Sequence, residues 1–224
     1  IDVFRGALGF ANNHFNKRFN EGENVHQLVN ERAHFADLIL RHAWNRFEWN
    51  ADISLIAVGG YGRCELHPHS DIDLLILMRR DKPDRYRQRI EQFLTFLWDI
   101  QLKIGHSTRS LTQCVDEARG DITVATNLME TRLLAGDDNL LAKLEVKTGP
   151  NKIWASEKFY HGKIDEQKAR HRKHGGTEYN LEPNIKEAPG GLRDIQVFNW
   201  TAKRHFQVHR RSLLIEEGFL SEEE

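Results

Sequence analysis

Two aspartates separated by one residue, Asp71 and Asp73, have the spacing in this sequence that best suits metal chemistry. They stand at the start of an apolar run, Ile72 to Met78, that predicts a β-strand. Alternate residues of a strand point to the same face, so the two carboxylates should project side by side, about 7 Å apart along the backbone. Paired carboxylates repel one another unless a cation neutralises them, and oxygen ligands of this kind suit Mg²⁺ or Mn²⁺. The pair therefore predicts a divalent-metal site completed by phosphate oxygens.

A glycine-rich turn lies between this strand and an earlier one, predicted over Ile53 to Val58. Glycines let a phosphate approach the backbone, and a short helix starting at the turn would direct free N–H groups at the anion. A Gly-Gly turn or an Asp-x-Asp alone is usually an ordinary loop or strand start, but the order strand, turn, helix, Ser-Asp-x-Asp and strand brings a phosphate cradle beside the carboxylates. The candidate nucleotide-binding residues here are Gly59, Gly60, Gly62, Arg63 and Ser70.

These residues carry a resemblance to a known superfamily. Gly-Gly-x-Gly-Arg followed by Ser-Asp-Ile-Asp-Leu resembles the signature of the DNA polymerase β-like nucleotidyltransferases, which transfer a nucleoside monophosphate from an NTP. A narrower resemblance rests on residues 59–75, on Gly-His-Ser-Thr-Arg at 105–109 and on the segment 180–196, which reads NLEPNIKEAPGGLRDIQ. All three are similar to the N-terminal part of the bacterial PII uridylyltransferase/uridylyl-removing enzymes.

The resemblance implies a reaction and a partner. UMP would pass from UTP to a tyrosine hydroxyl of the PII nitrogen-regulatory protein, with Asp71 and Asp73 holding the metal and pyrophosphate leaving. The family's uridylyl-removing activity belongs to an HD-type domain, and this chain has no His-Asp dipeptide. Glutamine sensing belongs to domains expected after residue 224. Two alternatives stay open: the same fold acting on a small-molecule acceptor, and a nucleotide-binding module without catalysis.

The family pattern is incomplete at one position. Superfamily members often add a third carboxylate from a neighbouring strand, but the third strand predicted here, Leu102 to Thr108, contains no acid. Asp99 and Asp121 are substitutes, although both also suit helix ends. His106 and Arg109, near the end of that strand, are secondary candidates for phosphate or base contacts; a structural histidine and a surface arginine are equally acceptable interpretations.

A second glycine pair marks a further candidate region. Lys186 and Arg193 flank Pro189-Gly190-Gly191 at the predicted start of the last helix, so this loop could close over nucleotide or acceptor. A plain helix-start turn is the competing interpretation.

The predicted elements indicate an α+β fold: a polymerase β-like core with a small mixed sheet, N-terminal helices and a C-terminal helical extension. Gly149-Pro150 marks the expected boundary between a nucleotidyltransferase domain (1–148) and a helical domain (149–224). Helices are predicted, with approximate bounds, over 3–19, 25–47, 90–98, 112–118, 124–134, 139–146, 154–171 and 192–209, with Asp121 as a cap.

Composition excludes several classes of protein. The 32 Lys and Arg nearly balance the 33 Asp and Glu, so net charge gives no reason to expect a nucleic-acid partner. Two cysteines, Cys64 and Cys114, indicate a reducing compartment, and the 12 histidines lack the spacing of a zinc site. The apolar runs are too short to cross a bilayer, which favours a cytoplasmic protein.

Overall fold

The computed structural model describes every residue except 82, 176–181, 183, 208–214, 216, 217 and 219–224. Its centre is a sheet with the strand order β3-β2-β1-β4, formed by β1 (Ile53–Val58), β2 (Ile72–Met78), β3 (Ile104–Ser110) and β4 (Thr131–Ala135). β1 pairs antiparallel with β2 and β4, whereas β2 and β3 are parallel. The predicted α+β class with a small mixed sheet is confirmed.

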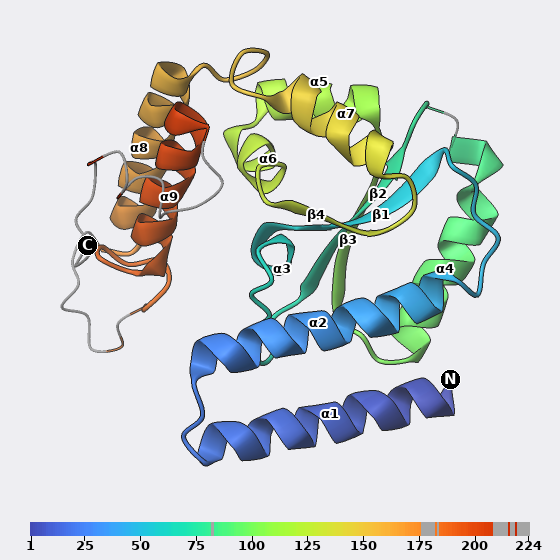
Figure 1. Cartoon of the computed structure of the whole chain (residues 1–224). Helices are drawn as coiled ribbons and strands as arrows, with labels where there is room; N and C mark the ends of the chain where they lie inside the picture. The colour runs from blue at the N-terminus through green and yellow to red at the C-terminus, as the bar shows by residue number, and fades with distance from the viewer. Residues whose placement is uncertain (82, 176–181, 183, 208–214, 216–217, 219–224) are drawn as a thin grey trace.

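Helices cover both faces of the sheet (Figure 1). α2 (Val25–Trp44) and α4 (Arg87–Asp99) pack on one face, and α1 (Asp2–Asn20) packs on α2. The other face is covered by α5 (Leu111–Gly120), α6 (Ile122–Asn127) and α7 (Asp138–Thr148). Two short elements, α3 (Gly59–Gly62) and the 3₁₀ turn η1 (Pro83–Arg85), lie in the connections.

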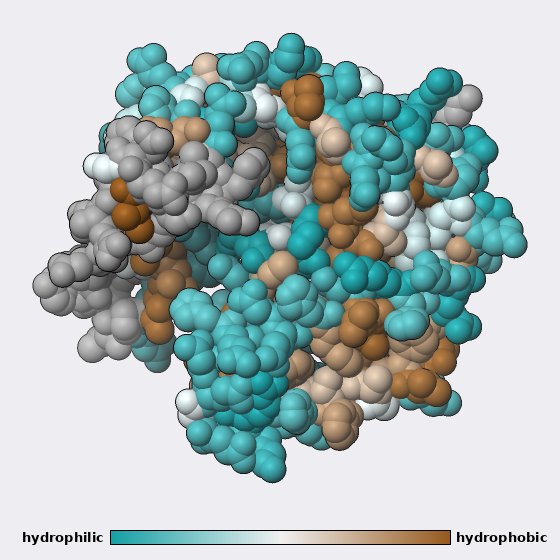
Figure 2. Space-filling view, viewed as in Figure 1, coloured by the Kyte–Doolittle hydropathy of each residue, from teal (hydrophilic) through white to brown (hydrophobic). Residues whose placement is uncertain are grey.

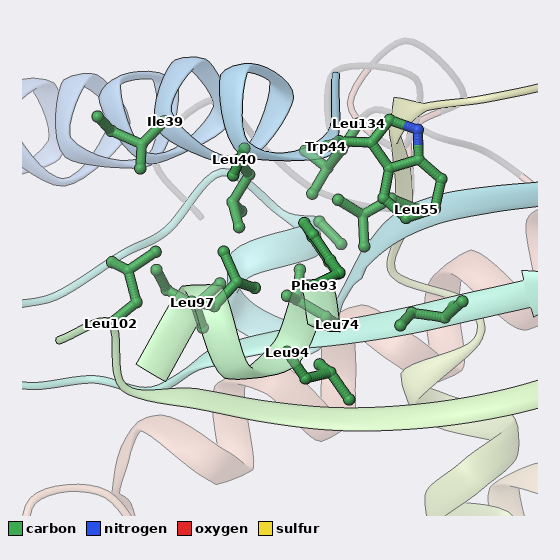
Figure 3. Packing of buried hydrophobic residues seen from close by; sticks show 14 of the residues in the cluster. Ile39, Leu40, Trp44, Leu55, Leu74, Phe93, Leu94, Leu97, Leu102 and Leu134 are labelled. Atoms are coloured by element: carbon green, nitrogen blue, oxygen red, sulfur yellow. The ribbon is translucent and has the colours of Figure 1, made fainter. Parts of the chain in front are cut away.

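Strand alternation explains these layers. In β2, Leu74 and Ile76 join the core formed with α2 and α4, whereas Leu75 and Leu77 join the core formed with α5, α6 and α7. Figure 3 shows the first of these cores, where Leu74 lies among the apolar side chains of the two covering helices. Because both faces are buried, β2 is apolar except at its start. Asp73 is its second residue, and Asp71 directly precedes the strand.

A pair of helices completes the fold. α8 (Ser156–Lys173) and α9 (Leu192–Phe206) pack together through Phe159, Val197 and Trp200. Ile122 at the start of α6 packs against this cluster, which joins the pair to the sheet domain. The domain boundary expected at residues 148 and 149 stays a prediction.

The predicted elements agree with the structure to within three residues at their ends, except around residue 130. The last predicted helix extends to residues 208 and 209, which lie outside the described residues. β1 and β2 have the predicted bounds, Asp121 caps α6 through the Thr123 N–H, and β3 begins and ends two residues later than expected. The helix predicted to continue through Leu134 was wrong, because α6 ends at Asn127 and β4 follows. The apolar pair Leu133-Leu134 suits either element, and pairing with the free edge of β1 decides for the strand.

The molecular surface is rich in hydrophilic residues (Figure 2), as expected from a sequence in which 29% of the residues are charged. Figure 2 shows a mostly hydrophilic face, with hydrophobic patches gathered in part at the lower right, in the region of α1 and α2. None of the helices in the described part of the chain combines the length and apolar character needed to cross a bilayer.

Candidate active site

Asp71 directly precedes β2, and Asp73 is its second residue, on the face of the sheet that α6 covers. Asp73 pairs in register with Gly105 of β3, and its side chain lines a cavity of about 250 Å³. Between the two aspartates, Ile72 is buried in the opposite core, so the alternation that turns Ile72 inward turns Asp73 toward the cavity. Ser107, Arg109 and Asn127 line the same cavity.

Glycines leave room around the Asp73 carboxylate on two sides. A Cβ at Gly59 would lie 3.8 Å from Asp73 Oδ2 and 3.9 Å from Asn127 Oδ1. A Cβ at Gly105 would stand inside van der Waals distance of Asp73 Oδ1. Gly59 also has a φ of 61°, a backbone conformation that glycine adopts most easily. The Gly-Gly turn and the aspartate pair are therefore neighbours in space as well as in sequence.

The electrostatics of the pair favour a cation. Partial burial and the nearby Asp71 carboxylate raise the pKa of Asp73 above its usual value, and the Lys186 ammonium acts in the opposite direction. Two like charges close together, one of them partly desolvated, are the situation that a bound divalent cation relieves. The two carboxylates therefore fit a divalent metal such as Mg²⁺.

Lys186 comes close to these aspartates because its loop is held by local hydrogen bonds. Asn184 Oδ1 accepts from the N–H groups of Lys186 (3.1 Å) and Glu187 (2.9 Å). At the other end, Asp194 accepts from the Gly190 N–H at 2.8 Å. The loop thus leads into α9, and the exposed Lys186 ammonium lies near enough to Asp73 to act on its pKa.

Arg63 has carboxylate partners of its own. Its guanidinium donates to Glu65 (2.9 and 3.0 Å) and to the buried Glu130 (2.5 Å). Glu130 also accepts from the Trp200 indole N–H at 2.5 Å, so one carboxylate connects the glycine turn to α9. A Cβ at Gly62 would collide with the Glu130 carbonyl, which explains the third glycine of the turn by packing.

Tyr61 anchors the same turn in the core. Its hydroxyl donates to Asp37 of α2 at 2.6 Å, and both side chains are almost fully buried. Arg132 donates to both Asp37 oxygens and lies over the Tyr61 ring at 5.3 Å. Burial raises the pKa of the Tyr61 phenol, which keeps it neutral as a donor. The motif tyrosine thus has a structural contact in this chain.

The remaining predicted residues are spread over several environments. Arg109 lines the cavity and pairs with Glu117 at 2.6 Å. The His106 ring lies 5.8 Å from that of Trp98 on α4, and strand alternation puts it on the sheet face opposite Asp73. Ser70 is exposed in the loop before β2, and the Arg193 guanidinium lies over the Trp200 ring at 5.4 Å.

Neither expected substitute supplies a third carboxylate. Asp121 is occupied as the cap of α6, and Asp99 ends α4, on the face of the sheet opposite Asp73. No cluster of three or more His, Cys, Asp or Glu side chains suited to a metal ion occurs among the described residues. A metal held here would rely on the aspartate pair together with ligands from the substrate.

The prediction from sequence missed three residues of the site: Ser107 and Asn127, which line the cavity, and Glu130, which pairs with Arg63. Asn127 ends α6, and the error in the length of that helix hid it. Glu130 lies between α6 and β4, so its contact with Arg63, 67 residues away, has no local signal.

Comparison with known proteins gives matches over the whole chain. A model described as a nucleotidyltransferase domain matches residues 40–123, and a model described as GlnD PII-uridylyltransferase matches residues 158–224. The first includes the glycine turn and the aspartate pair.

This chain is similar over its whole length to relatives named bifunctional uridylyltransferase/uridylyl-removing enzyme. The chain is 50% identical to that of Azotobacter vinelandii over 226 residues, 48% identical to that of Stutzerimonas stutzeri and 49% identical to that of Pseudomonas aeruginosa. In each case the match covers 100% of this chain and 25% of the relative, so the chain spans about a quarter of their length. The resemblance indicated by the motifs to the N-terminal part of such enzymes is confirmed.

Proposed function

We propose that this chain is the uridylyl-transferring part of a bifunctional uridylyltransferase/uridylyl-removing enzyme. It transfers UMP from UTP to a tyrosine hydroxyl of the PII protein and releases pyrophosphate. Similarity over the whole chain to enzymes of that name supports the reaction, and the match to a nucleotidyltransferase domain supports the reaction class. The observation that carries the proposal is the Asp73 carboxylate, partly desolvated next to Asp71 and flanked by Gly59 and Gly105.

Asp71 and Asp73 hold the divalent cation, Mg²⁺ or Mn²⁺, in this proposal. A cation held by them would supply charge neutralisation for the triphosphate and would lower the pKa of the attacking hydroxyl. The two aspartates set the position of the cation at the N-terminal end of β2, where Gly59 and Gly105 leave space for phosphate oxygens. Site chemistry therefore depends mainly on positioning and charge neutralisation.

The other residues divide into direct and supporting roles. The backbone of Gly59 and Gly60 and the side chains of Lys186 and Arg109 contact the nucleotide. Gly62 and Arg63 support the turn, since their contacts are with Glu130 and Glu65. Ser70 directly precedes Asp71, and His106 lines the cavity that contains Asp73 although its ring lies near Trp98 on the opposite face of the sheet. Arg193 lies over the Trp200 ring, so its contact with the nucleotide requires a change of side-chain position on binding.

The partner and setting follow from the same proposal. The acceptor is the PII protein in the cytoplasm, with no nucleic acid and no membrane involved. Glutamine acts through domains outside this chain. One alternative has an observation in its favour: the absence of a third carboxylate among the described residues suits a nucleotide-binding module without turnover.

The test is transfer of labelled UMP. Purified protein is incubated with UTP labelled at the α-phosphate, Mg²⁺ and PII, and incorporation into PII is measured. Asp71→Asn and Asp73→Asn should each reduce incorporation by about 10²-fold or more, while circular dichroism shows an unchanged fold. Full transfer by both variants would refute the site. Labelling of small hydroxylated acceptors in place of PII would point to the alternative acceptor, and UTP binding without turnover to the non-catalytic module.

A further inference from the structure

A second cavity, of about 390 Å³, lies apart from the one that contains Asp73. It is enclosed by α1, α2, the loop that precedes β2 and the loop that precedes β3. Much of its lining is apolar, and its volume falls within the range of small-molecule sites. The apolar lining residues are Leu8, Ala11, Phe15, Phe35, Ala36, Leu66, Pro68, Ile72, Ile100 and Leu102.

The charged lining of this cavity has one sign. Arg5, Arg32 and Lys103 contribute to it, and none of the lining residues is an aspartate or glutamate. Of the ion pairs formed within the described part of the chain, none involves these three side chains. In a chain whose overall charge is nearly balanced, this makes the cavity a local site of positive potential.

Arg32 is held in place by neutral groups. Its Nη1 donates to Asn12 Oδ1 at 2.7 Å, and its guanidinium lies over the Phe15 ring at 5.1 Å. Arg32 is half-buried, and this burial lowers its pKa. A partly desolvated charge without a counterion is unfavourable. An anion that accepts hydrogen bonds from the N–H groups of the Arg32 guanidinium would offset the free energy of desolvation.

Arg5 shows the same kind of arrangement at the outer helix. Its Nε donates to the Asp99 carbonyl oxygen at 2.8 Å, again a neutral acceptor. The cavity lining therefore carries two guanidinium groups, Arg32 half-buried and Arg5 exposed, that donate to neutral acceptors.

We propose that this cavity binds a small organic anion in which a phosphate or carboxylate is attached to an apolar group. The anionic group pairs with Arg32, and the apolar group lies on the surface formed by Phe15, Leu66 and Ile72. Binding here does not depend on the proposed transfer reaction.

The wall of the cavity leads along the chain to Asp71. His67 to Ser70 form one wall and lead directly into Asp71, and the Ile72 N–H donates to the Lys103 carbonyl at 2.9 Å. A ligand in contact with these residues alters the position available to Asp71. This second consequence rests on the proposed function, and it is measured separately as a change in the KM for UTP.

Phenyl phosphate and benzoate serve as probes of the binding site, with phenol and inorganic phosphate as controls for the anionic and apolar parts. Titration calorimetry of the purified chain should give saturable binding of at least one probe, with a Kd on the order of 1 mM. The tighter of the two probes identifies the preferred anion. Phenol and inorganic phosphate should each bind at least about tenfold more weakly, a loss of about 1.4 kcal/mol.

Two variants locate the binding. Arg32→Met removes the charge, and Gly9→Met fills the cavity from α1, where a Cβ meets no atom within 4 Å and a helix-favouring residue replaces glycine. Each should weaken probe binding at least about tenfold, whereas Arg119→Met, which removes an exposed arginine of α5, should leave it unchanged. Thermal unfolding checks that each variant is folded. If Arg32→Met does not fold, Gly9→Met alone locates the binding site.

Three results would overturn the proposal. The first is the absence of saturable binding of either probe up to about 10 mM. The second is binding unaffected by both Arg32→Met and Gly9→Met, which would place it elsewhere. The third is equal affinity for phenol or inorganic phosphate, which would remove the combined anionic and apolar character. Unchanged UTP kinetics with confirmed probe binding would refute only the link to Asp71.

Discussion

Gly105 and Asp73 approach each other closely enough that a single methyl group tests the candidate site. The two residues are paired in register on neighbouring strands, and a Cβ at Gly105 would stand well under 3.0 Å from Asp73 Oδ1. Gly105 is not among the residues with positive φ, so its backbone accepts alanine without strain. Gly105→Ala should therefore displace the carboxylate and leave the main chain in place.

The size of the effect follows from this contact. To reach van der Waals distance from the added Cβ, the Asp73 carboxylate must retreat by about 1 Å. A displacement of about 1 Å at a reacting centre lowers the rate by about 10²-fold. The free energy of unfolding should fall by only about 1 kcal/mol, because the side chain borders an open cavity and can move into it.

The assay is steady-state UMP transfer to PII with Mg²⁺, together with thermal unfolding of each variant. Gly120→Ala is the matched control, since a Cβ there meets no atom within 4 Å and its backbone is likewise unstrained. Gly105→Ala should lose most of its kcat while Gly120→Ala keeps it. A folded Gly105→Ala protein with the kcat of the unsubstituted chain would show that transfer does not depend on the position of Asp73.

Three further predictions address the surroundings of the site. Glu130→Gln leaves the Arg63 guanidinium without its buried counterion, so denaturant titration should show the free energy of unfolding lowered by about 3 kcal/mol; unchanged stability would mean that Glu65 alone suffices. Lys186→Met removes the ammonium near the paired carboxylates and should raise the KM for UTP by about tenfold, with unfolding unaffected; a normal KM would exclude contact with the triphosphate. Burial raises the pKa of Cys114 to about 12, so at pH 8 a thiol reagent should modify Cys64 alone in the folded protein and both cysteines in denaturant; fast reaction of two thiols in the folded chain would contradict the buried environment.

Part of the fold could be predicted because its signals are local. β1 and β2 are apolar runs bounded by Gly59-Gly60 and by the Ser70-Asp71 pair, and the structure has them at the predicted residues. β4 was predicted as helix because its five residues carry no period that distinguishes the two states, and its strand conformation depends on pairing with β1.

The same distinction separates the residues of the candidate site. Gly59, Asp71 and Asp73 lie within 15 residues of one another, and strand alternation with a glycine turn is enough to predict their arrangement. His106 was grouped with them by sequence position, but alternation along β3 directs its ring toward α4. To predict the face of the sheet to which a side chain points, one needs the pairing register of its strand, and sequence position alone does not supply that register.

The amino-acid sequence by itself was sufficient for the reaction class, the two central strands and the placement of the aspartate pair beside the glycine turn, because turn and strand geometry depend on neighbouring residues. Only the tertiary structure could bring Lys186 and Asn127 to Asp73, connect Arg63 to Trp200 through Glu130, and leave Arg32 without a counterion beside an apolar cavity. These contacts join segments tens of residues apart, and they exist because helices pack on the four-stranded sheet in one arrangement, which no local pattern encodes.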